Sequence, residues 1–245
     1  MISPWSLFKE SIRLFLKNFK YLLKFWLVKL LIQYPPLILV VIIAMISVAP
    51  IYSSALNLSP TSLTWLIYIA IPIAVGWIIL TFWLGTASLV QAYSISANTT
   101  PTIKQLLSQG WKLTWKVFAT SALEILAILG GLVLLIIPGL IFSIWFTFTI
   151  SVVVAENLSG TAALKRSKQL VKGRFWKTVS YLLFPTAIII AYSFITSAVA
   201  AAIPKPSRSV FELLFSIVTW PFGLVSLIYS FLVYREFKKI NISPS

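Results

Sequence analysis

The chain has 245 residues and a formal charge of +15, with 59% hydrophobic side chains, only 10% charged ones and a mean hydropathy of +0.96. A water-soluble domain needs about a quarter of its residues charged to cover its surface. This composition therefore excludes a soluble protein and predicts an all-α integral membrane protein.

The chain contains no Cys, no His and no Asp, which removes most catalytic and metal-binding chemistry. Imidazole bases, thiolate nucleophiles, thiol zinc sites and aspartyl dyads cannot form. The five Glu residues are too scattered in sequence to suggest a cage for a hard metal. A Ser-Lys nucleophile at Ser167 and Lys168 stays open, although adjacent helical residues do not face each other. We expect no enzyme, no cofactor and no metal site.

Residues 1–24 predict an amphipathic surface helix, with Ser3 as N-cap and Pro4 in the first turn. Basic residues occupy one face of this helix: Lys9, Arg13, Lys17, Lys20 and Lys24. Apolar residues recur at spacings of three and four on another face, at Trp5, Phe8, Ile12, Phe15, Phe19 and Leu22. We expect the helix to lie in the headgroup plane with its aromatic face toward the hydrocarbon.

Long charge-free stretches follow, and the first, between Lys29 and Lys104, has room for two spans of about 20 residues. Three more charge-free stretches follow it along the chain. They predict six transmembrane helices at about 28–52, 63–95, 114–137, 139–156, 176–203 and 210–234. These helices would form hairpins at about 28–95, 114–156 and 176–234, within a single membrane domain over residues 1–245.

All but two of the 20 basic residues fall on one side of this arrangement, and the exceptions are Lys205 and Arg208. Cationic residues gather on the cytoplasmic side of membrane proteins, so both termini are predicted to be cytoplasmic. The high positive charge then needs no nucleic acid to explain it, and we expect no nucleic-acid partner. The charged residues near the N-terminus also argue against a signal peptide.

Similar junctions recur after the second, fourth and sixth predicted helices, at residues 98–101, 157–160 and 241–244. Two short basic segments, Thr102 to Gly110 and Thr161 to Gly173, each end in a Gly suited to closing a helix. They are predicted either as in-plane helices or as solvated loop helices. Together these features suggest three tandem units, each an in-plane helix followed by a membrane hairpin.

Prolines fall inside most of the predicted spans, and Pro138-Gly139 is expected to turn the third helix into the fourth. A proline in lipid frees a carbonyl that neighbouring side chains must satisfy. The prolines therefore indicate a kinked, packed bundle or, alternatively, broken helices that line a cavity as in transporters.

Glu124 is the one acidic residue with no local explanation in the sequence. It lies about 12 Å beyond Lys116 along the third helix, close to the middle of the bilayer. An intramembrane acid is a functional candidate. The alternative is a protonated side chain that bonds to a neighbouring helix and fixes its register.

The middle of the chain resembles the six-span membrane domain attached to some bacterial glycerophosphodiester phosphodiesterases, and related stand-alone inner-membrane proteins of unknown function. The matching residues are Ile137-Pro138-Gly139-Leu140, Trp145, Val154 to Gly160, Ala163-Leu164, Arg166-Ser167, Leu170 to Gly173 and Trp176. The resemblance implies fold and location only. The catalytic barrel of those enzymes is absent, and their chemistry uses histidines that this chain lacks.

The sequence thus predicts a non-catalytic, multi-pass module of a bacterial cytoplasmic membrane that organises lipid or a membrane-protein partner. Its basic inner face is expected to bind anionic lipid headgroups through Lys9, Arg13, Lys17, Lys20, Lys24, Lys165, Arg166, Lys168, Lys172, Arg174 and Lys177. The alternative is a transporter or permease component that uses Glu124.

Overall fold

The computed structural model describes residues 2–52, 60–202 and 204–242, and the described chain is helical with no strand. Its helices are α1 (Pro4–Lys17), α2 (Phe19–Tyr52), α3 (Pro60–Ser96), α4 (Ile103–Leu134), α5 (Ile136–Trp145), α6 (Thr149–Glu156), α7 (Thr161–Val171), α8 (Phe175–Ala202) and α9 (Lys205–Ile242). Four segments of the described chain are long and apolar enough to cross a membrane: Ile71–Ser96, Ile103–Val133, Ile136–Glu156 and Phe175–Ala201.

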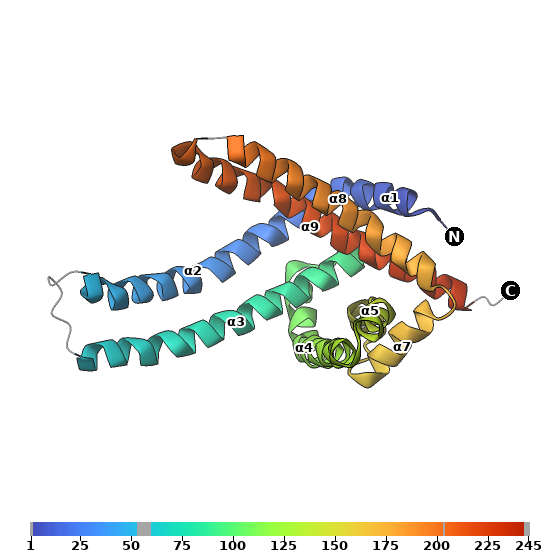
Figure 1. Cartoon of the computed structure of the whole chain (residues 1–245), viewed down its shortest axis with the longest axis horizontal. Helices are drawn as coiled ribbons and strands as arrows, with labels where there is room; N and C mark the ends of the chain where they lie inside the picture. The colour runs from blue at the N-terminus through green and yellow to red at the C-terminus, as the bar shows by residue number, and fades with distance from the viewer. Residues whose placement is uncertain (1, 53–59, 203, 243–245) are drawn as a thin grey trace.

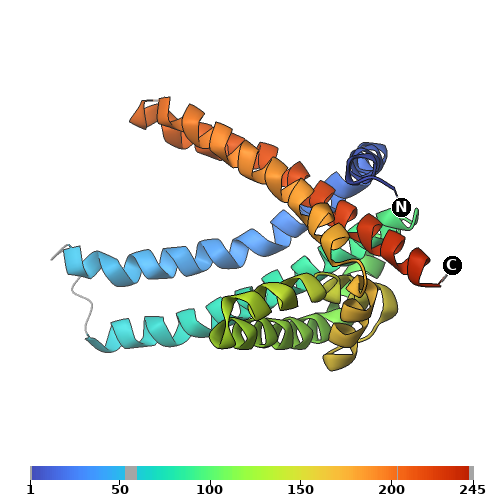
Figure 2. The ribbon, with the colours of Figure 1, turned by 45° about the vertical axis from the view of Figure 1, so that its right-hand side comes forward.

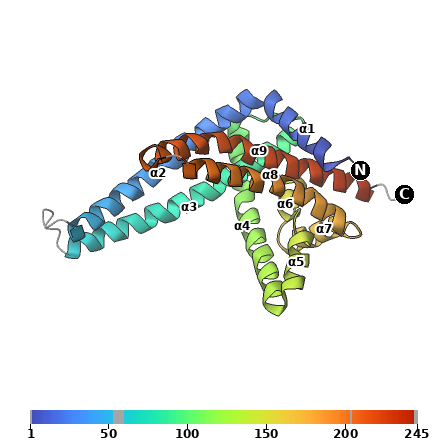
Figure 3. The ribbon, with the colours of Figure 1, turned by 45° about the horizontal axis from the view of Figure 1, so that its top comes forward.

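Three antiparallel helix pairs, α2–α3, α4 with α5–α6, and α8–α9, extend in different directions from one end of the molecule (Figures 1 and 3). We call these pairs the arms. The N- and C-terminal ends lie together at the end from which the arms extend, as Figure 2 also shows.

The buried core lies where the arms meet, and we call this cluster the hub. It takes apolar side chains from most of the helices, including Leu7, Leu22, Ile95, Val152, Leu170, Ile228 and Phe237. The far halves of the arms contribute little to it. In α8, for example, Ile190, Phe194 and Ile195 are exposed. Exposed apolar side chains along the arms are what a lipid solvent permits.

The N-terminal helix is shorter than the 1–24 predicted. Ser3 caps it as expected, since its hydroxyl accepts the Ser6 N–H at 3.2 Å, but the helix ends at Asn18. The Asn18 side-chain amide donates to the Leu14 carbonyl at 2.9 Å and closes the last turn. Lys20 and Lys24 consequently belong to α2, a second helix at an angle to the first (Figure 1).

The segment from Thr102 to Gly110 is not a separate surface helix, because α4 runs unbroken from Ile103 to Leu134. Thr102 and Gln105 form a capping box at its start. Gly110 does not end a helix. A Cβ at Gly110 would lie 2.8 Å from the Cβ of Ala87 on α3, so this Gly permits close approach of two helices.

The turn between the third and fourth predicted helices lies at Leu135, three residues before the predicted Pro138-Gly139. Leu135 is extended, with φ −165° and ψ 147°, and Pro138 lies in the first turn of α5. Gly139 packs against α4, since a Cβ there would lie 2.9 Å from the Leu132 nitrogen. Pro138 and Gly139 therefore shape the start of α5 rather than the turn.

The fourth predicted helix, 139–156, is interrupted. It is divided into α5 and α6 by a turn at residues 146–148. The hydroxyl of Ser167 on α7 bridges the interruption: it accepts the Phe148 N–H at 3.1 Å and donates to the Trp145 carbonyl at 2.8 Å. These backbone groups are thus satisfied by a neighbouring helix, as membrane packing requires.

The remaining predicted helices appear with longer or slightly shifted bounds, and the prolines inside them do not end them. Pro185 in α8 removes the N–H that would bond the Tyr181 carbonyl, and the Tyr229 hydroxyl of α9 donates to that carbonyl at 3.0 Å. The recurring junctions are explained in part. Asn98 and Asn157 both adopt left-handed conformations after helices, whereas Asn241 lies inside α9, and Ser243 and Pro244 lie outside the described residues.

Candidate functional site: the charged surface of the hub

Helix α1 presents three different faces. One face is buried in the hub through Leu7, Ser11 and Leu14, and the Phe8 ring packs against Phe184 of α8 with centroids 5.5 Å apart. This corrects the expectation of one aromatic face turned toward lipid, since Phe8, Phe15 and Leu22 are buried in protein. The Tyr181 hydroxyl also donates to the Ile2 carbonyl, which fixes the start of α1 to α8.

The second face of α1 is an exposed apolar strip formed by Trp5, Ile12 and Leu16. These side chains are 52%, 37% and 65% exposed. They project between the buried face and the charged residues, because each residue advances about 100° around the helix. Lys9 lies beside this strip, with its ammonium 5.0 Å from the Trp5 ring centroid. An exposed apolar strip next to basic residues is typical of helices in a membrane interface.

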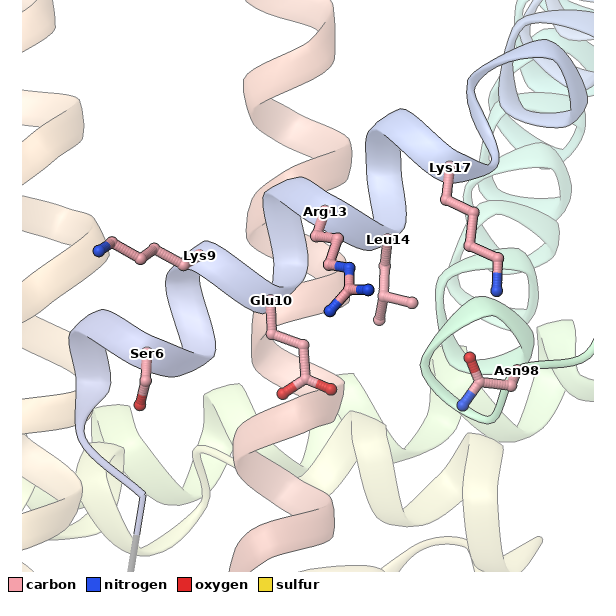
Figure 4. Close-up of a pocket in the computed structure, with 7 residues that line it drawn as sticks. All are labelled: Ser6, Lys9, Glu10, Arg13, Leu14, Lys17 and Asn98. Carbon is pink, nitrogen blue, oxygen red and sulfur yellow. The ribbon is translucent and has the colours of Figure 1, made fainter.

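The third face of α1 borders a depression of about 470 Å³ between α1 and the end of α3. Ser6, Glu10, Arg13 and Lys17 point toward its side of the helix, whereas Lys9 points away along α1 (Figure 4). Asn98, at the end of α3, faces it from the other side. Glu10, Arg13 and Lys17 make no ion pair with any residue that the structure describes. Their charges are therefore available to a ligand.

The predicted basic residues beyond α1 differ in their contacts. Lys20 and Lys24 are exposed on α2 but do not line the depression. Lys165, Lys172 and Lys177 are exposed at or near α7. The other three contact protein: Arg166 pairs with Glu156, Lys168 lies 3.9 Å from the Trp145 ring centroid, and Arg174 donates to Asn241 at 3.0 Å. The exposed lysines, rather than these three side chains, are free to meet an external anion.

Glu156 joins three elements of the hub. Its carboxylate accepts hydrogen bonds from Arg166 of α7 at 3.0 Å and from Lys238 and Tyr234 of α9 at 3.0 and 2.7 Å. The sequence places Glu156 beside the basic segment that follows it, but the two partners on α9 lie about 80 residues further along. Only the fold brings them together, so sequence reasoning missed them.

A further tie lies at the start of α2, where the Tyr21 hydroxyl donates to the Pro101 carbonyl at 2.6 Å. Burial raises the pKa of the Tyr21 phenol to about 12. The phenol thus stays protonated at neutral pH and remains a hydrogen-bond donor.

Glu124 lies on α4, half-buried, with no hydrogen bond or ion pair to any described residue. Nearby, the Lys116 ammonium donates to Asn157 at 2.9 Å, and Gly131 packs beside Gly139. These two contacts set the antiparallel register of α4 against α5 and α6. In this register Glu124 lies at the same height along the helices as the interruption at 146–148. Thr120, one turn away, is not bonded to Glu124, and its hydroxyl accepts the Gly160 N–H at 2.8 Å.

Ser167 is fully buried and bridges the α5–α6 interruption, which accounts for it without a reaction. Lys168 is directed to the Trp145 ring. The two side chains therefore have different partners, and this geometry does not support a Ser-Lys nucleophile. Among the described residues, no group of three acidic side chains could hold a metal.

Fold and composition thus define an all-helical membrane protein whose helices meet in a hub with charged residues at its surface. The chain belongs to the family described as Domain of unknown function (DUF7847), whose model matches residues 107–237, more than half of the chain. Comparison with curated proteins found no match, and comparison with solved structures found none either. The resemblance to the membrane domain of glycerophosphodiester phosphodiesterases stays a prediction.

Proposed function

We propose that this protein is a non-catalytic six-span module of a bacterial cytoplasmic membrane that binds anionic lipid through the basic surface of its hub. In this role it organises lipid or a membrane-protein partner at the inner leaflet. The observation that carries the proposal is the pairing, on α1, of an exposed apolar strip with a row of basic residues. Each basic residue near an anionic bilayer contributes about 1 kcal/mol to binding.

The six spans comprise the four apolar segments named above together with α2 and α9. These two helices have 34 and 38 residues, more than the roughly 20 residues that a span requires. The positive-inside rule supports a cytoplasmic hub, because the basic residues cluster around it in sequence while Lys205 and Arg208 lie at the far end of the α8–α9 arm. Both termini are then cytoplasmic.

A depth measurement on the complete protein tests the role of α1. In this cysteine-free chain, Leu16→Cys carries a nitroxide label, and the label's accessibility to oxygen and to a water-soluble nickel complex is measured in liposomes. We expect the label to be protected from nickel in the bilayer, whereas a label at Lys165→Cys is accessible. Nickel accessibility of Leu16 equal to that of Lys165 would contradict an interfacial α1.

The lipid preference is tested by measuring the phospholipids that copurify with the protein. Replacing Arg13 and Lys17 by Gln together is expected to lower the retained anionic lipid about 25-fold, given the contribution of about 1 kcal/mol from each basic residue. The control Arg13→Lys keeps the charge and is expected to retain the lipid. Equal retention of anionic and zwitterionic lipid by the unmodified protein would remove the electrostatic part of the proposal.

A transporter or permease component is the second candidate. The position of Glu124, at the height of the interruption between α5 and α6, favours it. A cavity of about 80 Å³, lined by Thr147, Ser226 and Ser230 together with apolar side chains, borders the same interruption. Flux into proteoliposomes that follows a proton gradient and is lost in Glu124→Gln, but not in the exposed Glu10→Gln, would support it. Ser167 already satisfies the interruption, which is why the lipid-binding role ranks first.

A further inference from the structure

A narrow groove runs between α3 and α4 on the outside of the molecule. Its volume is about 210 Å³, and its walls come from Ile78, Ile79 and Phe82 of α3 and from Trp111, Trp115 and Phe118 of α4. Rings stiffen these walls, with Phe82 and Phe118 edge to face at 5.5 Å. The groove lies within two of the segments that are apolar enough to cross a membrane.

The floor of the groove offers no polar group. Thr114 is the only lining residue with a hydroxyl, and that hydroxyl donates to the Gly110 carbonyl of its own helix at 2.7 Å. A hydrophobic occupant would therefore leave no polar atom unsatisfied. The groove is suited to hydrocarbon.

The position of the groove indicates which hydrocarbon. Trp111 and Phe118 are seven residues apart, so the groove is about 10 Å long on α4. Its walls are aromatic and aliphatic and belong to two segments that are apolar enough to cross a membrane. Lipid acyl chains are the apolar groups that surround such segments in a bilayer. The groove is therefore suited to an acyl chain.

The end of the groove nearer the start of α4 is polar. Trp111 and Trp115 are 50% and 59% exposed, and neither indole N–H has an acceptor among the described residues. By contrast, the neighbouring Trp83 donates its indole N–H to the Leu107 carbonyl at 2.9 Å. Lys112 lies one turn before Trp115, exposed and without an ion pair to any described residue. Trp111, Lys112 and Trp115 thus bring three donor groups within about one turn of α4 at this end of the groove.

We propose that this groove binds one phospholipid of the inner leaflet, with an acyl chain between α3 and α4 and the phosphate at Lys112, Trp111 and Trp115. An ammonium and two indole N–H groups complement a phosphate diester. The site shares the cytoplasmic orientation of the hub with the proposed function, but it uses no residue of α1. It is therefore a defined lipid site rather than a further part of the general basic surface.

Photocrosslinking tests this assignment in proteoliposomes. The probe is a phosphatidylglycerol with a diazirine close to the carbonyl end of one acyl chain, so that the reactive group lies within the groove, and labelled peptides are identified by mass spectrometry. We expect labelling of residues 78–82 and 111–118 to exceed that of the exposed α4 face at 125–129 about fivefold, the factor that corresponds to about 1 kcal/mol of headgroup binding at Lys112. Labelling in proportion to exposure would show only unspecific lipid contact and would overturn the proposal.

Ile79→Trp fills the groove and is expected to lower the local labelling to the level of the exposed α4 face. Ile190→Trp, at an exposed position of α8, is the matched control and should leave it unchanged. Lys112→Gln should lower labelling about fivefold, with Lys104→Gln, exposed on the same helix, as its control. Thermal unfolding of each variant in detergent separates lost binding from lost folding, because a variant that unfolds like the unmodified protein yet labels fully contradicts the site.

The two lipid proposals fail separately. If α1 were not interfacial, the variant with Gln at positions 13 and 17 would retain lipid while groove labelling stayed intact. If the groove held no lipid, Ile79→Trp would change nothing while the α1 variant still lost anionic lipid.

Discussion

Ser167 joins two segments that sequence adjacency does not connect. A hydroxyl can donate once and accept more than once, and Ser167 uses both capacities on the two sides of the α5–α6 interruption. The helix ladder is broken there, so the Trp145 carbonyl and the Phe148 N–H both depend on this side chain. Removing it would leave two buried backbone groups unpaired.

Ser167→Ala should therefore lower the free energy of unfolding by about 1 to 3 kcal/mol, the cost of leaving buried polar groups unsatisfied. The change is expected as a lower midpoint of thermal unfolding in detergent. Ser180→Ala, at an exposed position on α8, is the control and should have little effect. Equal midpoints for the two variants would show that the interruption does not need the Ser167 hydroxyl.

Sequence reasoning at the residue scale succeeds where the determinant is local. Ser3 is the predicted N-cap, and Gly173, with φ +77°, follows α7 in the conformation expected of a helix-ending Gly. Ser167 and Glu156 could not be assigned in this way. Their partners are set by how α5, α6, α7 and α9 meet, and no spacing along the chain encodes that.

Gly110 shows the same limit at the scale of elements. Its sequence context predicts the end of a short helix, yet α4 continues through it. Here the missing side chain lets α4 lie close to α3 instead of ending the helix. Ala87 of α3 is fully buried against it. Small residues at helix crossings let backbones approach closely in membranes. The neighbouring sequence does not show whether a Gly serves such a crossing or ends a helix.

Gly110→Ala is expected to destabilise the α3–α4 contact by about 1 to 3 kcal/mol through overpacking, since the new methyl group meets the backbone of Ala87. Gly130→Ala is a matched control on the same helix, where nothing lies within 4 Å of the new Cβ. It should be neutral or stabilise the helix by about 0.5 to 1 kcal/mol. Thermal unfolding of both variants decides the matter, and a Gly110→Ala protein as stable as the control would contradict the tight contact.

At the scale of the whole molecule, composition predicts the helical class that the structure has, whereas the six spans and the three membrane hairpins stay predictions. The hub could not be predicted, because it depends on contacts between helices far apart in sequence. α1, for example, packs against α8 and α9. The apolar pattern of residues 1–24 fits burial in lipid and burial in protein equally well, so the sequence alone did not separate the two.

The proposed orientation can be tested with single cysteines, since the chain has none of its own. A cysteine at Leu135, between α4 and α5, should react with a membrane-impermeant maleimide in intact cells. A cysteine at Lys165, on α7, should react only after the membrane is opened. Reporter fusions at the two ends should both report the cytoplasm. The reverse labelling pattern, or ends on opposite sides, would contradict the six-span arrangement.

The packing of α1 on α8 and α9 has a consequence for biosynthesis. Because synthesis runs from the N-terminal side, α1 leaves the ribosome before α8 and α9, and its partners Phe184 and Tyr229 follow only later. Until then the apolar residues that will be buried have no protein to cover them. We expect α1 to stay on the membrane surface until α8 and α9 have been inserted. The α8–α9 pair then completes the hub, and a chain truncated before this pair would have an incomplete core.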